Sequence, residues 1–181
     1  MSVESAPAKQ RLFFAVWPPA ELQAGLADLA RDLQHELGGK VTRADSIHLT
    51  LVFLGDVATT RLDEITAAGD AVRWQRFTLM IDRCGGWAHN RIAWAGPERT
   101  PQPLADLVTD LQTRVRGLGF AIDERAYAPH MTLVRKTSRP HRTTRIEAAA
   151  QWPVDAFVLV RSQLDAQGSR YSVIRRWPCI P

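Results

Sequence analysis

HLTLVFLG at residues 48–55 and HMTLVR at residues 130–135 begin with almost the same phrase, His-x-Thr-Leu-Val. The chain has only 5 histidines in 181 residues, and two of them start these phrases. Each phrase reads as a β-strand and follows a long segment with helical spacing. No shorter period repeats along the chain, so we predict two related halves and no tandem array.

The internal spacing of each phrase indicates what it offers to a substrate. Side chains alternate between the two faces of a strand, so His48 and Thr50 should share one face, as should His130 and Thr132. An imidazole can give or take a proton near neutral pH, and a threonine hydroxyl can donate a hydrogen bond to a phosphoryl oxygen. Two facing copies would supply an acid, a base and two donors, which suffices for phosphodiester cleavage without a metal or a covalent intermediate.

A structural role for these histidines is the competing interpretation. A single histidine in an apolar strand is most often a hydrogen-bonded structural residue, and a short motif is weak support for anything else. The duplication favours function, because packing alone would prefer apolar residues at inward positions.

The rest of the chain predicts an α+β fold. Apolar spacing predicts helices over 20–37, 60–74 and 104–118. Short apolar runs predict strands over 11–17, 47–54, 77–82, 91–96, 131–135, 154–160 and 170–177, with turns at Gly85-Gly86 and near Gln167-Gly168. We expect one bilobal domain over residues 1–181, with residues 1–10 as a flexible tail. Its two pseudo-twofold-related halves would have antiparallel sheets flanked by helices, with both histidines in a central cleft.

Composition is consistent with a soluble globular protein: 45% of the residues are hydrophobic and 23% are charged. A net charge of +4 favours an anionic partner, although only weakly. No apolar stretch can span a bilayer and the first residues show no secretory pattern, so we expect no membrane partner and a cytoplasmic location. Cys84 and Cys179 form no CxxC pair and suggest no zinc site, and only a single disulfide between them stays open.

These phrases and their flanks resemble the 2H phosphoesterase superfamily. Within it, the chain is similar to the bacterial and archaeal RNA 2′,3′-cyclic phosphodiesterases, once called 2′-5′ RNA ligases. RLFFAVWPP (11–19), HLTLVFLG, PHMTLVRK (129–136) and SQLDAQGSRYSVIRRWP (162–178) carry the resemblance. It implies a bilobal α+β fold and hydrolysis of a terminal 2′,3′-cyclic phosphate on RNA to a 2′-phosphate, without metal or cofactor. We also expect a monomer.

Site roles follow from the resemblance, residue by residue. It makes His48 the proton donor and His130 the proton acceptor, although a near-symmetric site permits either assignment. Thr50 and Thr132 would hold the non-bridging oxygens. Arg135 would also bind the phosphate, but it lies an odd number of residues after His130, so this role requires a bend, a bulge or the end of the strand.

Other candidates for substrate contact are weaker. Of the pair Phe13 and Phe14, we take Phe14 as the residue that could stack on a base, although such a pair is usually core. Tyr171 could contact the nucleotide. Arg142 lies in the basic run SRPHRTTR (138–145), which reads as a loop and could follow an RNA backbone, or could simply be solvated.

Two other functions compete with the RNA-end phosphodiesterase. The first is a sister activity of the superfamily, on a 2′-5′ linkage or a small cyclic nucleotide. The second is a non-catalytic RNA-binding module. Retention of both histidines and both threonines argues against the second, because binding alone could use lysine and arginine.

Overall fold

Nine strands and three helices make up the part of the chain that the computed structural model describes, residues 8–165 and 168–179. The helices are α1 (Ala20–Leu37), α2 (Leu62–Asp70) and α3 (Gln102–Gly117), with short 3₁₀ turns at Ala44–Ser46 and Thr59–Arg61. The strands are β1 (Lys9–Val16), β2 (Lys40–Val41), β3 (Leu49–Ala58), β4 (Phe77–Trp87), β5 (Ile92–Gly96), β6 (Met131–Arg135), β7 (Thr144–Val154), β8 (Ala156–Asp165) and β9 (Gly168–Pro178). The α+β class is therefore confirmed.

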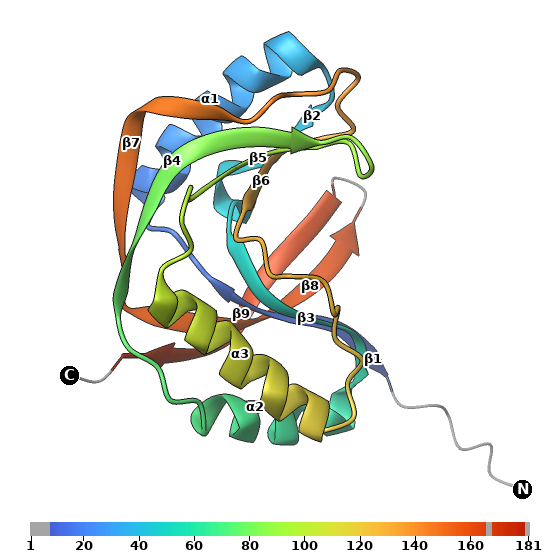
Figure 1. Cartoon of the computed structure of the whole chain (residues 1–181). Helices are drawn as coiled ribbons and strands as arrows, with labels where there is room; N and C mark the ends of the chain where they lie inside the picture. The colour runs from blue at the N-terminus through green and yellow to red at the C-terminus, as the bar shows by residue number, and fades with distance from the viewer. Residues whose placement is uncertain (1–7, 166–167, 180–181) are drawn as a thin grey trace, which may run out of the picture.

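All strands belong to one antiparallel sheet with the order β7-β4-β5-β6-β3-β1-β8-β9, and β2 pairs with β6 (Figure 1). At its centre, β3 and β6 share a single residue pair, Leu49 with Met131. We call the strands on one side of this junction (β2 and β4–β7) the β6 half, and those on the other side (β1, β3, β8 and β9) the β3 half. Each half contains one histidine phrase, but the β3 half combines strands from both ends of the chain.

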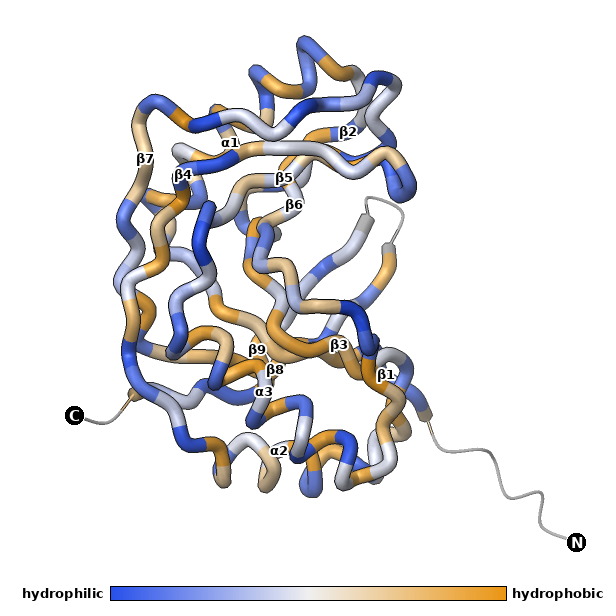
Figure 2. The backbone as a smooth tube through the Cα atoms, in the orientation of Figure 1, coloured by the Kyte–Doolittle hydropathy of each residue, from blue (hydrophilic) through white to orange (hydrophobic). Residues whose placement is uncertain are grey.

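The helices cover one face of this sheet because their apolar residues recur every three or four positions. α1 packs against β6, α3 packs against β3, and α2 contacts α3 and β9 (Figure 1). Five buried side chains of α3 join the main core: Leu104, Leu107, Val108, Leu111 and Val115. Each such leucine or valine stabilises the fold by about 1.5–3 kcal/mol. Figure 2 shows the hydrophobic residues concentrated along β1, β3 and β8, in the middle of the molecule.

The glycine pair of β4 does not form the predicted turn. Gly85 and Gly86 lie within β4, opposite Trp94 and Ala93 of β5, and the turn follows at residues 88–91. A Cβ atom at Gly85 would lie 2.7 Å from the Trp94 ring, and one at Gly86 would lie 3.0 Å from His141. These glycines permit close packing within a strand. A glycine pair can mark either a turn or such close packing, and the sequence alone does not distinguish the two.

Other boundaries also differ from expectation. β7 covers residues that were predicted as loop or left unassigned, and most of its side chains are exposed at the edge of the sheet. The strand predicted at 154–160 is divided, since β7 ends at Val154 and β8 begins at Ala156. Lys9 and Gln10 pair with β3 and are not part of a tail. Residues 1–7 and Gln167 of the predicted turn lie outside the described residues.

Two further observations bear on the composition. Cys84 and Cys179 are not joined by a disulfide. Among the helices in the described part of the chain, none is both long and apolar enough to cross a membrane.

Candidate active site

The junction between β3 and β6 brings the two histidine phrases together. Leu49 pairs with Met131 across the junction, and both side chains are fully buried. His48 and His130 directly precede these residues. Because neighbouring side chains point to opposite faces of a strand, both histidines lie on the face opposite to the helices, which we call the histidine face.

The single residue pair at this junction also indicates which threonine of the other phrase lies nearest to each histidine. Continued by one residue in each direction, the register places His48 across from Thr132 and Thr50 across from His130. Each polar pair therefore combines one residue from each half. The sequence analysis predicted that His48 and Thr50 share a face of their strand, and likewise His130 and Thr132, and this register is compatible with both expectations.

A β-bulge occurs at the same position in both phrases. In β3, Leu51 has no partner on β1, because Val52 pairs with Phe14 and Thr50 pairs with Ala15. In β6, Leu133 is likewise skipped by β5. Each bulged residue lies three positions after its histidine, and an extra residue reverses the facing of the side chains that follow.

The bulge in β6 explains how Arg135 can share a face with His130 although an odd number of residues separates them. The Arg135 side chain returns to the histidine face, in line with Trp94 and Thr132. Its positive charge contributes to lowering the pKa of both His48 and His130. The bulge in β3 places Phe53 at the equivalent position of the other phrase, so one half presents an arginine where the other presents an exposed phenylalanine.

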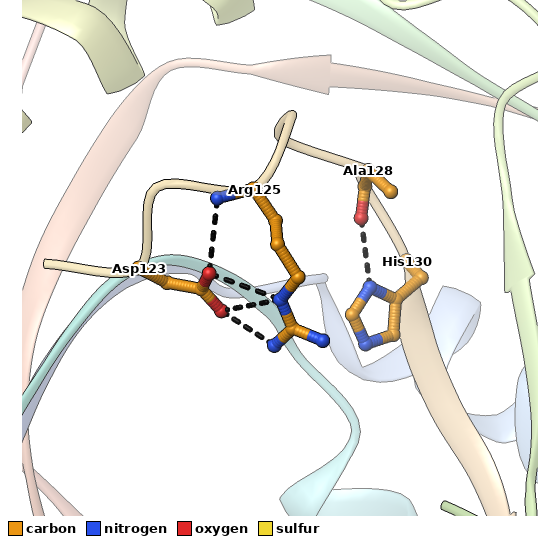
Figure 3. A network of polar contacts seen from close by, with 4 residues as sticks. All are labelled: Asp123, Arg125, Ala128 and His130. Carbon is orange, nitrogen blue, oxygen red and sulfur yellow. Dashed lines mark hydrogen bonds and ion pairs between the residues drawn. The ribbon is translucent and has the colours of Figure 1, made fainter. Parts of the chain in front are cut away.

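Both imidazoles are oriented in the same way. Nδ1 of His48 lies 2.8 Å from the carbonyl oxygen of Ser46, and Nδ1 of His130 lies 2.8 Å from that of Ala128 (Figure 3). A carbonyl oxygen can only accept, so each Nδ1 carries the hydrogen and donates it. Each neutral ring therefore has its unprotonated Nε2 available for proton transfer.

His48 is enclosed by aromatic rings. It stacks against Phe13 and Trp17, with both centroid distances 4.9 Å, and it meets Tyr171 edge-on at 5.0 Å. Burial is the main cause that lowers the pKa of His48, to about 4, and the charges of Arg135 and His130 add to it, while the bond to Ser46 opposes it. His48 is therefore neutral at pH 7 in this structure.

His130 has a more open environment. Its ring meets Trp87 edge-on at 4.4 Å. Burial, followed by the charge of Arg135, lowers the pKa of His130 as well, against the opposing effect of its bond to Ala128. The ion pair of Arg125 with Asp123 lies in the same segment, and Figure 3 shows the guanidinium beside the His130 ring. This pairing lowers the pKa of Asp123 to about 2.

Tyr127 ties the segment before His130 to the other phrase. Its hydroxyl donates a hydrogen bond of 2.9 Å to the backbone oxygen of Thr50. Burial raises the pKa of this phenol, so it stays protonated and keeps its donor.

The weaker sequence candidates divide in the structure. Tyr171 lies in the site, against His48. Phe14 is fully buried in the main core beneath the helices, so its prediction as a substrate contact is wrong, and Phe13 is the phenylalanine on the histidine face. Both faces of β1 are apolar, which is why alternation could not separate the two. Arg142 is exposed between β6 and β7, beside His141.

Sequence reasoning missed Trp17 and Trp87, the ring partners of the two histidines. Each lies at the end of a strand, so the only available signal was an aromatic residue next to a predicted turn. Within residues 8–165 and 168–179, no three histidine, cysteine or acidic side chains gather as metal ligands would.

Comparisons with known proteins identify the family of this chain. Residues 16–94 match the family described as LigT like Phosphoesterase. The RNA 2′,3′-cyclic phosphodiesterase of Escherichia coli (strain K12) is 30% identical over 168 residues, which cover 93% of this chain and 96% of that protein. The enzyme of the same name from Thermus thermophilus is 28% identical over 92% of this chain and 89% of its own length.

Solved structures give the same result. The crystal structure of E. coli LigT complexed with 3′-AMP superimposes with a TM-score of 0.85 at 28% identity, over 96% of this chain and 100% of that one. The crystal structure of TT0787 of Thermus thermophilus superimposes with a TM-score of 0.79 at 26% identity, over 93% of this chain and 97% of that one. The chain therefore belongs to the LigT-like 2H phosphoesterases, in the family of the RNA 2′,3′-cyclic phosphodiesterases.

Proposed function

We propose that this chain hydrolyses the 2′,3′-cyclic phosphate at the end of an RNA to a 2′-phosphate, by acid–base catalysis with two histidines and without a metal. The observation that carries the proposal is the arrangement at the β3–β6 junction. Two imidazoles with available Nε2 atoms share one face, and each lies across from a threonine of the other phrase. Family membership supports the substrate class, because the relatives that match across the chain bear the name of this activity.

In the proposed reaction a water oxygen attacks phosphorus and its proton passes to His130. The bond from phosphorus to O3′ breaks, and the departing oxygen takes a proton from His48. Thr50 and Thr132 donate hydrogen bonds to the non-bridging oxygens, and Arg135 offsets their charge. Each proton transfer contributes roughly 10²–10⁴-fold to the rate.

The environment of the histidines bears on which one is the acid. The resemblance assigns that role to His48, yet its aromatic surroundings disfavour the protonated form in the empty site. A bound phosphodiester anion raises the pKa of a nearby imidazole, since opposite charge favours the charged form. The assignment to His48 therefore requires that the substrate restores its proton.

A substrate with sulfur in place of O3′ tests this assignment. A thiolate leaves without a proton, so a variant that lacks the acid should recover turnover with this substrate, whereas a variant that lacks the base should not. We expect recovery for His48→Ala alone. Recovery for His130→Ala alone would reverse the two roles.

The product identifies the reaction itself. An RNA oligonucleotide that ends in a 2′,3′-cyclic phosphate should be opened to the 2′-phosphate, because the acid lies beside O3′. A 3′-phosphate would mean that the substrate binds in the opposite direction. Preferred cleavage of a 2′-5′-linked dinucleotide would support the sister activity, and salt-sensitive RNA binding without turnover would support a binding module.

We also propose the finer features of the architecture. The two phrases, with their equal bulges and equal histidine–carbonyl bonds, support a pseudo-twofold relation between two lobes of one domain, with the substrate between them. The monomeric state and the cytoplasmic location stay predictions. Sedimentation at micromolar concentration would test the first of these.

A further inference from the structure

The exposed large apolar side chains gather in one half of the molecule. Among residues 8–165 and 168–179 they are Phe53, Leu164 and Val173, which are 47%, 75% and 53% exposed. They lie on β3, β8 and β9, all in the β3 half. Such residues occur singly on most surfaces, so their relation to one another decides whether they matter.

Strand register places these side chains on the histidine face. Phe53 pairs with Phe13, Phe13 with Val160, and Val160 with Val173, so one row of apolar side chains crosses all four strands. Paired residues in an antiparallel sheet share a face. Leu164 lies four residues after Val160 and therefore shares that face too.

This apolar row is continuous with the active site and is not covered by the helices. Phe13 stacks on the His48 ring and meets Tyr171 edge-on at 5.4 Å. The alternate residues of β1, such as Leu12 and Phe14, are the ones that pack under the helices. The row therefore meets the site at Phe13 and crosses the strands from Phe53 on β3 to Val173 on β9.

Positive charge borders the row at its far end. The Arg11 guanidinium lies over the Phe53 ring, 5.0 Å from its centroid. Arg11 also lines a hollow of about 470 Å³ together with Lys9, Leu164 and one acidic residue, Asp56. Aromatic and apolar surface bordered by arginine and lysine is the composition that binds single-stranded nucleic acid, through stacked bases and phosphate contacts.

We propose that this part of the histidine face binds the RNA nucleotides on the 5′ side of the cyclic phosphate, with a base stacked on Phe53 and the backbone beside Arg11. The proposal rests on the proposed function. Five residues of β3, one of them bulged, separate Phe53 from His48, and the Phe13 ring lies between the two side chains, so we place the base upstream of the terminal nucleotide. Arg135 occupies the equivalent position in the β6 half. The cyclic phosphate would therefore bind toward Arg135, on the side of the site opposite to Phe53.

Substrate length tests the proposal. Turnover is measured for a 2′,3′-cyclic mononucleotide and for a tetranucleotide with the same cyclic end, in the wild type and in Phe53→Ala, Phe53→Tyr and Arg11→Ala. We expect Phe53→Ala to lower kcat/KM about tenfold for the tetranucleotide and to leave the mononucleotide unchanged, because one stacked base is lost. Phe53→Tyr should retain the wild-type values, since the ring remains.

Charge is tested in parallel. Arg11→Ala should weaken the salt dependence of kcat/KM for the tetranucleotide only, whereas Arg116→Ala, an exposed arginine on α3, should change neither substrate. Melting temperatures confirm that each variant is folded.

The outcomes separate the two proposals. Equal loss on both substrates in Phe53→Ala, or no loss on either, would overturn the upstream site. A loss of kcat/KM for the tetranucleotide alone in Arg139→Ala would also overturn it. Arg139 lies in the loop that follows β6, so the RNA would then extend from the site toward the β6 half. A wild type that turns over neither substrate would overturn the proposed function and this inference with it.

Discussion

The two histidine phrases share a backbone pattern from the histidine to the first bulge and have different surroundings. Both begin an inner strand, both bulge three residues after the histidine, and both imidazoles donate Nδ1–H to the carbonyl two residues earlier. His48, however, is surrounded by Phe13, Trp17 and Tyr171, whereas His130 meets Trp87 beside an exposed ion pair. The shared pattern leaves Nε2 of each neutral ring without a hydrogen, and the neighbours then give each copy its own proton affinity.

The position five residues after each histidine shows the same principle for substrate binding. Equal bulges turn Phe53 and Arg135 to the same face. A planar ring suits a base and a guanidinium suits a phosphate, so under the proposed function these unlike residues would give the site a direction.

The largest effect should follow removal of either imidazole. His48→Ala and His130→Ala should each lower kcat by roughly 10²–10⁴-fold, because each removes one proton-transfer role. The melting temperature of each should stay close to that of the wild type. If one variant kept most of its activity, the two phrases would not be equivalent in catalysis.

Substitution of Arg135 and of Phe53 should have very different effects on turnover of a small substrate. With a cyclic mononucleotide, Arg135→Ala should lower kcat/KM about 100-fold, since a charge-assisted contact to the phosphate is worth about 2–3 kcal/mol. Phe53→Ala should leave the same constant unchanged. Equal losses would mean that the two positions serve the same part of the substrate.

The aromatic environment of His48 should also make the free energy of unfolding depend on pH. The folded pKa of His48, about 4, lies below its ordinary value of 6.5, so the unfolded chain binds the proton first as the pH falls. The low pKa of His48 therefore does not affect the free energy of unfolding well above pH 6.5, and it lowers that free energy by about 2 kcal/mol at pH 5. Urea unfolding should show that the free energy of unfolding of His48→Phe falls less than that of the wild type between pH 6.5 and pH 5. An unchanged pH dependence would contradict the aromatic burial of His48.

The threonines should be close to equivalent. Thr50→Val and Thr132→Val each remove one hydroxyl and keep the shape of the side chain, so each should lower kcat/KM about tenfold, the value of one hydrogen bond. A difference of more than tenfold between the two variants would show that the phosphate lies toward one phrase.

Metal removal should have no effect. If the two phrases supply all the acid, base and donor groups, enzyme treated with EDTA should keep its full kcat for an RNA with a cyclic end. Loss of activity that zinc or magnesium restores would mean that side chains alone are insufficient.

Much of this site follows from spacing within the phrases, because a strand's two-residue period fixes which side chains share a face. The sequence therefore predicted the shared face of His48 and Thr50, and it also predicted that Arg135 needs an irregular backbone. It could not locate that bulge, because a bulge depends on partner strands distant in sequence. The face of Phe14 was equally hidden, since both faces of β1 are apolar.

Helices were predicted better than strands. The α1 segment agrees at both ends, because its apolar period and flanking prolines and glycines are local signals. The β7 segment was missed, because an edge strand with mostly exposed side chains lacks alternation. Pairing with β4 and not intrinsic pattern makes it a strand.

The single pair between Leu49 and Met131 has a consequence for how this enzyme could have arisen. Around it, His48 faces Thr132 as His130 faces Thr50, which is the contact pattern of an isologous interface between two identical subunits. A self-associating ancestral subunit with one histidine phrase would present the same four side chains at its dimer axis. Covalent linkage of two such subunits would free each copy to change separately, as Phe53 and Arg135 differ here, and the position of β8 and β9 in the β3 half would also require an exchange of strands between the copies.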